Sequence, residues 1–149
     1  MHKIMFVCHG NICRSPMAEF VLKDMVKKRG ISEQFLIASS ATSREEIGNP
    51  VHRGTKKKLS EYNISTDNKV AVQFTKEDYH HYDYIIVMDS YNIINLMHIV
   101  GEDAAGKIYK LLDFADGGDI ADPWYTGNFD DTYRDVAKGC EGLLKHLGL

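Results

Sequence analysis

Residues 3–20 read KIMFVCHGNICRSPMAEF, and the interpretation of the whole chain starts from this stretch. The apolar run from Ile4 to Val7 predicts a buried strand that ends at a cysteine. Ser15 and Pro16 predict the start of a helix, with the serine as cap and the proline in the first turn. A loop between a strand and a helix start leaves backbone N–H groups unpaired. We therefore expect an anion-binding loop between the first strand and the first helix.

Composition limits the class of protein. The chain has 149 residues, of which 44% are hydrophobic and 26% are charged, which predicts one compact domain over residues 1–149. The formal net charge of -3 gives no reason to expect nucleic acid or an acidic membrane as a partner. The first apolar run is too short for a signal-peptide core or a membrane span, and three cysteines are too few for a disulfide framework. We expect a cytoplasmic protein with reduced thiols and no obligate partner.

Strand and helix patterns alternate along the chain. The expected strands are Ile4–Val7, Phe35–Ala38, Tyr84–Met88 and Ile108–Leu112. The expected helices run from Ser15 to Gly30, over about 54–62, onward from Asp89-Ser90, and from Tyr133 to Leu147. This alternation predicts a parallel sheet with helices on both faces and a ligand crevice at the carboxyl ends of the strands. The stretch 113–128, DFADGGDIADPWYTGN, is the longest irregular one and is a candidate functional loop.

The segment CHGNICRS, residues 8–15, carries the chemistry. In the positive field of the loop we expect Cys8 to be a thiolate and a nucleophile. Gly10 lets the backbone bend around an anion, and the planar guanidinium of Arg14 can hold two phosphate oxygens. Transfer of a phosphoryl group to Cys8 would form a covalent phosphocysteine. The alternative is a small buried cysteine with a surface arginine, but the strand–loop–helix context favours the functional interpretation.

The motif VCHGNICRSPMAE resembles the active-site loop of the low-molecular-weight protein tyrosine phosphatases. ATSREEIGNPVHRG, YDYIIVMD and DPWY resemble later motifs of that family in the same order, so the resemblance spans essentially the whole chain. It implies a four-stranded parallel sheet flanked by helices, with the phosphate-binding loop after the first strand. It also implies hydrolysis of phosphotyrosine in proteins, and of small aryl phosphates, through a cysteinyl-phosphate, without a metal or other cofactor.

The resemblance also assigns roles to residues. Cys8 is then the nucleophile, Arg14 the phosphate clamp and Asp122 the general acid and later the general base. Asn11, Ser15 and Ser39 match positions that shape the loop or ease departure of the thiolate.

Chemistry supports a carboxyl group in the acid–base role, because the leaving oxygen needs a proton and the attacking water needs a base. Chemistry alone does not choose among the carboxylates of the long loop and its end, and the family match decides for Asp122. The competing residues are Asp113, Asp116, Asp119, Asp130 and Asp131.

Side chains around the loop are candidates for contact with phosphate or substrate: His9, Gly10, Asn11, Ile12, Cys13, Ser15, Trp124 and Tyr125. Trp124 and Tyr125 either form a rim on which an aromatic ring stacks or pack as partly buried side chains. His9 is expected at the rim. Ile12 stands where relatives that act on phosphoarginine have threonine, which favours a tyrosine phosphatase.

The sequence departs from the family pattern at two places. Glu45 stands where many members place an aromatic residue on the cleft wall, which leaves substrate preference open. Lys69 or Asn68 lies near the position of a family histidine that helps to place the loop asparagine, so we expect a different supporting network.

The remaining cysteines bear on two further hypotheses. Cys13 either forms a reversible disulfide with Cys8 or is a small buried residue, and Cys140 is expected in the core. An arsenate reductase would need more cysteines to pass a disulfide outward, and only Cys140 lies beyond the loop. A non-enzymatic phosphotyrosine- or anion-binding module would not need Cys8, Arg14 and Asp122 together. The six histidines outside the loop show no metal-ligand spacing, so no metal site is expected.

Overall fold

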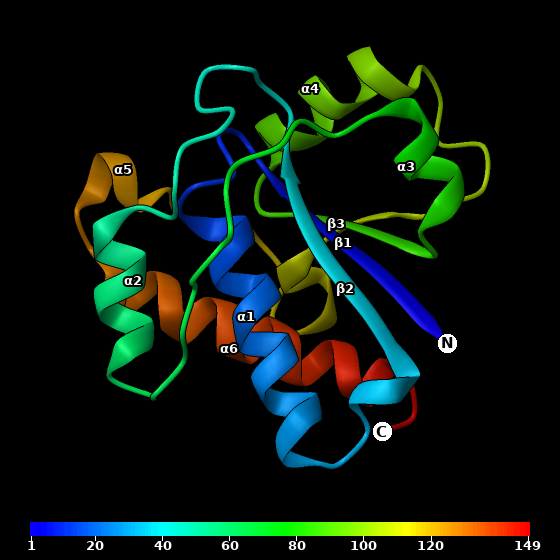
Figure 1. The fold of residues 1–149 in the computed structure, drawn as a ribbon. Coiled ribbons are helices and arrows are strands. Elements are labelled where there is room, and N and C mark those ends of the chain that lie inside the picture. The colour runs from blue at the N-terminus through cyan, green and yellow to red at the C-terminus, as the bar shows by residue number, and fades with distance from the viewer.

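The computed structural model describes residues 1–149 and contains a four-stranded parallel sheet of order β2-β1-β3-β4 (Figure 1). The strands are β1 (His2–Cys8), β2 (Phe35–Ala41), β3 (Tyr84–Val87) and β4 (Ile108–Lys110). β1 is central and pairs with β2 from His2↔Phe35 to Cys8↔Ala41, and with β3 on its other side. The predicted four-stranded parallel α/β fold is confirmed.

Helices cover both faces of the sheet. They are α1 (Arg14–Lys28), α2 (Arg53–Ser60), α3 (Lys76–His81), α4 (Ser90–Val100), α5 (Pro123–Thr126) and α6 (Phe129–His146). Two short 3-10 segments, Ser32–Gln34 and Leu111–Phe114, complete the set. α1 and α6 pack on one face with α2 beside them, whereas α3 and α4 lie on the other face (Figure 1). None of these helices has the length and apolar character that crossing a membrane requires.

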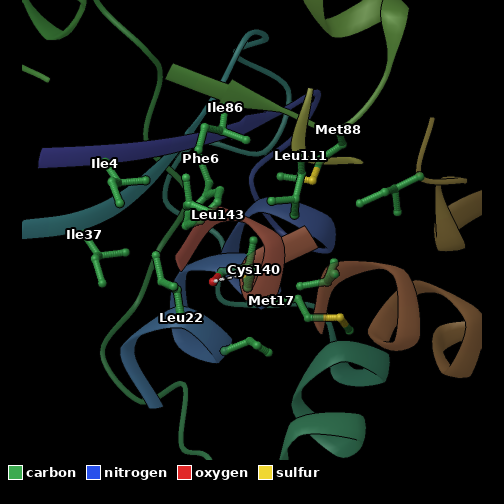
Figure 2. Packing of buried hydrophobic residues seen from close by; sticks show 14 of the residues in the cluster. Ile4, Phe6, Met17, Leu22, Ile37, Ile86, Met88, Leu111, Cys140 and Leu143 are labelled. Carbon is green, nitrogen blue, oxygen red and sulfur yellow. Dashed lines mark hydrogen bonds between the residues drawn. The ribbon is translucent and has the colours of Figure 1, made fainter. Parts of the chain in front are cut away.

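The alternation of side chains along β1 divides the interior into two cores. Ile4 and Phe6 belong to the cluster under α1 and α6, which Figure 2 shows from close by. Met5 and Val7 point to the opposite face and pack with residues of α3 and α4. Cys140 of α6 is fully buried in the first cluster, so its predicted core position is confirmed.

The connections around β1 and β3 create the crevice for the site. β1 runs into α1 on one face of the sheet, whereas β3 runs into α4 on the other face. The two loops therefore diverge at the carboxyl ends of neighbouring strands, where parallel α/β folds bind ligands. Cys8 lies at the end of β1, and Asp89 directly precedes α4.

Several boundaries differ from the sequence-based prediction, as for α6, which begins at Phe129 and not at Tyr133, and two of these differences have a clear physical reason. Ser15 is not the cap of the first helix: α1 begins at Arg14, and Cys13 occupies the cap position without a side-chain hydrogen bond. The Ser15 hydroxyl lies instead near the sulfur of Cys8. The last strand ends at Lys110, because Leu111 and the next residues turn into a 3-10 segment that carries Leu111 into the core.

Two short helices were not predicted. α3 begins with a capping box, in which the side chains of Thr75 and Asp78 each accept a hydrogen bond from the other's backbone N–H. The sequence carries this pattern as Thr-x-x-Asp. α5 lies inside the stretch expected to be irregular and begins with Pro123, after Asp122 as cap. At four residues it is too short for a periodic pattern to be visible.

Candidate active site

β1 delivers Cys8 to the base of the loop. The residue is only 3% exposed, and its Sγ accepts hydrogen bonds from the backbone N–H groups of Asn11 (3.3 Å) and Ser15 (3.5 Å). The Ser15 hydroxyl lies 3.0 Å from the same sulfur. Donors that converge on sulfur favour a negative charge there, which is the nucleophilic form of cysteine.

Asn11 fixes the turn of the loop. Its φ angle of +59° lies in the left-handed region, which asparagine tolerates better than most residues. Its buried Nδ2 donates to the hydroxyls of Ser15 (2.7 Å) and Ser39 (2.9 Å), and its Oδ1 accepts from the N–H of Val72 (3.1 Å). Because Ser15 accepts from Asn11, its own proton can go to the Cys8 sulfur at 3.0 Å or to the Ser40 carbonyl oxygen at 3.4 Å. The structure thus brings together the three residues predicted to support the loop: Asn11, Ser15 and Ser39.

The buried carboxylate of Glu19 orients the Ser39 hydroxyl. Glu19 of α1 is 5% exposed and accepts from the Ser39 hydroxyl (2.6 Å) and from Lys23 Nζ (2.5 Å). Lys69 Nζ lies 3.7 Å from the same carboxylate and donates to the Ser39 carbonyl oxygen at 2.8 Å. Burial lowers the pKa of Lys69, and the attraction of Glu19 offsets this only in part. Of the two residues expected near this place, Lys69 is the one that joins the network.

Glu19 is the supporting residue that the sequence analysis missed. Its signal is positional: it follows Ser15 by four residues, so both lie on one face of α1. That face also carries the buried Leu22 and Val26. A carboxylate on a buried helix face needs polar partners, which indicates a structural or functional network.

Arg14 is 2% exposed and is held by carboxylates from two other segments. One terminal nitrogen donates to Asp89 Oδ2 (2.6 Å) and to the Ile120 carbonyl oxygen (2.9 Å), and the other to Asp122 Oδ2 (3.4 Å). Burial acts to lower the pKa of Arg14, but the negative groups of Cys8, Asp89 and Asp122 outweigh it and raise this pKa. The buried Nε has no partner within the protein, so it is a donor that an anion in the loop can satisfy.

Asp122 is positioned by both of its carboxylate oxygens. Oδ1 accepts from the N–H of Trp124 (3.1 Å) as the cap of α5, whereas Oδ2 faces Arg14. Its side chain is 22% exposed, so it borders the cleft without being buried in it.

The competing carboxylates have partners elsewhere. Asp113 accepts from the Lys110 N–H, Asp116 pairs with Lys138, Asp119 with Lys110 and Ser90, Asp130 with Lys58, and Asp131 with Asn128 and Arg134. Of these six aspartates only Asp122 contacts Arg14, so the geometry favours the carboxylate that the family resemblance indicated.

The rim of the site carries a polar pair. The exposed ring of His9 bonds the carboxylate of Glu45, and both border a hollow of about 250 Å³ together with Ile12 and Trp124. At position 10 an added Cβ would lie 3.3 Å from Cγ of Glu46, a tight contact that this side chain would have to relieve by shifting. Glu45 thus lies at the cleft, where the sequence comparison placed an aromatic residue in many relatives.

Trp124 and Tyr125 are 57% and 84% exposed, so both lie at the rim and not in the core. The Trp124 ring meets the His52 ring edge-on, with ring centres 5.8 Å apart. A second hollow, of about 470 Å³, adjoins the first and shares His9, Asp122 and Tyr125 with it.

A larger hollow of about 690 Å³ lies between α2 and the start of α6 and contains no residue of the loop. Three of its four charged residues already pair with one another, because Lys58 binds both Glu61 and Asp130. Volume alone therefore does not mark the site.

All three thiols are free and buried. Burial and the neighbouring Cys8 raise the pKa of Cys13 to about 12, and burial also raises the pKa of Cys140. A reversible Cys8–Cys13 disulfide remains a prediction. No group of three or more His, Cys, Asp or Glu side chains is arranged to hold a metal ion.

The loop between the first strand and the first helix of the four-stranded parallel sheet thus carries a cysteine at its base and an arginine at its end, the arrangement that the sequence motifs predicted. The family model described as "Low molecular weight phosphotyrosine protein phosphatase" matches residues 3–148. The chain therefore belongs to this family, and the resemblance seen in the sequence motifs is confirmed.

Individual relatives agree over nearly the full length. The chain is 41% identical to the low molecular weight protein-tyrosine-phosphatase YfkJ of Bacillus subtilis, over 99% of this chain and 96% of the relative. Among solved structures, YfkJ superposes with a TM-score of 0.94 at 40% identity, covering 99% of this chain and 95% of that one. SP-PTP from Streptococcus pyogenes gives a TM-score of 0.88 at 47% identity, covering 99% and 93%. A Drosophila arginine phosphatase, DARP, has the same fold, with a TM-score of 0.90 at 28% identity, covering 99% and 98%.

Proposed function

We propose that the chain hydrolyses phosphotyrosine in proteins, and small aryl phosphates, in two steps at Cys8. The Cys8 sulfur forms a bond to phosphorus while the bond from phosphorus to the tyrosine oxygen breaks. Asp122 gives its proton to that oxygen, so the leaving group departs as a neutral phenol. The observation that carries the proposal is that the loop N–H groups of Asn11 and Ser15 converge on the Cys8 sulfur while Asp122 contacts Arg14, whose Nε is buried without a partner.

In the second step Asp122, now a carboxylate, takes a proton from water as the water attacks phosphorus. The sulfur–phosphorus bond breaks, and Cys8 leaves as a thiolate with phosphate as the second product. The hydroxyl of Ser15, 3.0 Å from the sulfur, supports that departure. Arg14 and the loop N–H groups stabilise charge on the phosphoryl oxygens throughout.

The other loop and rim residues shape binding. Gly10, Ile12 and Cys13 form the loop backbone, whereas His9, Trp124 and Tyr125 border the place of the aromatic ring. Phosphotyrosine-containing proteins are the substrates, and residues 1–149 act as one catalytic domain. Because the nucleophile must stay a reduced thiol, a cytoplasmic location fits this chemistry.

Arsenate reduction is less well supported. A thiol relay needs a second cysteine that can reach the first and then be reached by a reductant. Cys140 is fully buried in the core against the Ala18 carbonyl oxygen, so it cannot pass a disulfide outward.

The test compares hydrolysis of a phosphotyrosine peptide, a phosphoserine peptide and phosphoarginine in buffer with EDTA. Cys8→Ser is expected to abolish turnover, and Asp122→Ala to lower kcat by about 10²–10⁴-fold. Asp119→Ala is the matched control, because this neighbouring carboxylate pairs with Lys110 instead of Arg14. Faster hydrolysis of phosphoarginine than of phosphotyrosine would contradict the substrate assignment. Binding of phosphate without turnover of any substrate would show an anion receptor.

A further inference from the structure

The hollow of about 470 Å³ beside the phosphate loop is lined in part by residues of α4 that the two-step mechanism does not use. Its base is formed by Arg14 and Asp122, which belong to the chemistry. Its outer walls are Tyr91 and Asn95 of α4 on one side and Tyr125 of α5 on the other. Tyr91 is 76% exposed, so it contributes little to the core.

α4 is attached firmly to the phosphate site. Asp89 caps the helix by accepting from the Asn92 N–H at 2.8 Å, and its other oxygen accepts from Arg14 at 2.6 Å. The side chain of Asn92 returns a bond to the Asp89 N–H at 3.1 Å. Tyr91 lies between these two capping residues, so its backbone is held at a fixed place relative to Arg14.

The hollow also adjoins the place of the substrate ring. It shares His9, Asp122 and Tyr125 with the smaller hollow, which contains Ile12 and Trp124. Consecutive residues of a peptide are 3.8 Å apart at their Cα atoms. While the phosphotyrosine ring lies against Ile12 and Trp124, the side chain of an adjacent residue can therefore reach the larger hollow.

We infer that the hollow between Tyr91 and Tyr125 is a specificity subsite for an aromatic or long aliphatic side chain next to phosphotyrosine in the substrate. The inference rests on the proposed function. Two tyrosine rings offer apolar and stacking surface to such a side chain. An acidic side chain is repelled by the carboxylate of Asp89, which borders the hollow. A basic side chain finds that carboxylate already bound to Arg14.

The test uses Tyr91→Ala with Ile94→Ala as control. Ile94 is on the same helix and is 57% exposed, but it does not line the hollow. The substrates are phosphotyrosine peptides with Leu, Phe, Glu, Lys or Gly at both neighbouring positions, together with 4-nitrophenyl phosphate, which has no neighbouring residue. The quantity compared is kcat/KM for each peptide divided by kcat/KM for the small substrate.

For the parent we expect the Leu and Phe peptides to exceed the Gly peptide about tenfold in this ratio, and the Glu peptide to fall below it. Tyr91→Ala is expected to remove that advantage mainly through KM, whereas Tyr91→Phe and Ile94→Ala keep it. Three outcomes would overturn the inference while the proposed function stands. They are equal ratios for all peptides, a preference for the Lys or Glu peptide, and an equal fall of the ratio in Tyr91→Ala and Ile94→Ala. If the parent turns over neither the peptides nor 4-nitrophenyl phosphate, both fail.

Discussion

Replacing Lys69 with methionine tests whether the network under the loop acts on chemistry or only on stability. Lys69 Nζ donates to the Ser39 carbonyl oxygen at 2.8 Å and lies 3.7 Å from Glu19. The lost bond from a charged donor costs about 1.5–3 kcal/mol by itself. Burial, however, lowers the pKa of Lys69 in spite of Glu19, so the folded state holds its charge less readily than water does. Methionine relieves that cost, and Glu19 keeps its bonds from Lys23 and Ser39, so we expect the free energy of unfolding to fall by only about 1–2 kcal/mol.

The effect on activity follows the chain of hydrogen bonds from Glu19 to the loop. Without Lys69, the Ser39 carbonyl oxygen loses its hydrogen bond and the Glu19 carboxylate loses a nearby cation. Glu19 and Ser39 are then less firmly placed, so the bond from Asn11 to the Ser39 hydroxyl is weakened. One such bond contributes about 1 kcal/mol net. If that amount of positioning is lost in the transition state, kcat/KM falls about fivefold, since 1.36 kcal/mol corresponds to a factor of ten.

The assay is kcat/KM for 4-nitrophenyl phosphate, with urea unfolding measured on the same preparations. Lys23→Met is the matched control, because Lys23 bonds the same Glu19 carboxylate but is 44% exposed and lies on the same helix. Loss of the Lys23 bond should change the free energy of unfolding by less than about 0.5 kcal/mol and leave kcat/KM near the parent value. Lys69→Arg should recover most of the activity. The reasoning is refuted if Lys69→Met keeps parent activity while folded, or if Lys23→Met loses as much activity.

Three further substitutions test other parts of the structure. Asp89→Asn removes the carboxylate closest to Arg14, and KM for 4-nitrophenyl phosphate is expected to rise about tenfold; a parent KM would show that Asp122 and the Ile120 carbonyl oxygen suffice to place the guanidinium. Burial raises the folded-state pKa of Cys140 above 9.0, so the unfolded chain releases this proton first as the pH rises. The thiol therefore lowers the free energy of unfolding by about 1.4 kcal/mol per pH unit above pH about 9, and Cys140→Ser should lack this slope in urea titrations; equal slopes refute the assignment. Gly142→Ala places a Cβ onto the Phe114 carbonyl oxygen and should cost about 1–3 kcal/mol in the same titration, whereas parent stability would contradict this close approach.

Local patterns in the sequence determined the elements and the loop. Apolar runs and helical spacing depend on neighbouring residues, so the strands, most helices and their parallel arrangement were predictable. The loop from Cys8 to Ser15 was predictable for the same reason, because a strand end, a glycine and a helix start are contiguous there. The sequence also indicated Arg14 as the residue expected to hold an anion and Ile12 as a candidate for contact with phosphate or substrate.

Only the tertiary structure decided which distant groups meet around that loop. Arg14 contacts Asp89, 75 positions away, because β1 and β3 are neighbours and their helices leave on opposite faces. The approach of Lys69 to the buried Glu19 likewise depends on the path of a later segment past α1. The sequence indicated only that Lys69 or Asn68 lies near the place that supports the loop asparagine, and it did not indicate a contact with Glu19.

Local rules also failed where a longer-range partner was stronger. Ser15 fits a helix cap by sequence, yet its hydroxyl accepts from Asn11 and lies beside the Cys8 sulfur, so no cap bond forms. Chemistry left six aspartates of the long loop and its end equivalent, and of these the fold brought only Asp122 to Arg14. The sequence by itself therefore determined the fold class and the nucleophile loop, because both depend on contiguous residues. The charge partners of the loop were decided by the tertiary structure, because electrostatic contacts depend on distance in space and not on separation along the chain.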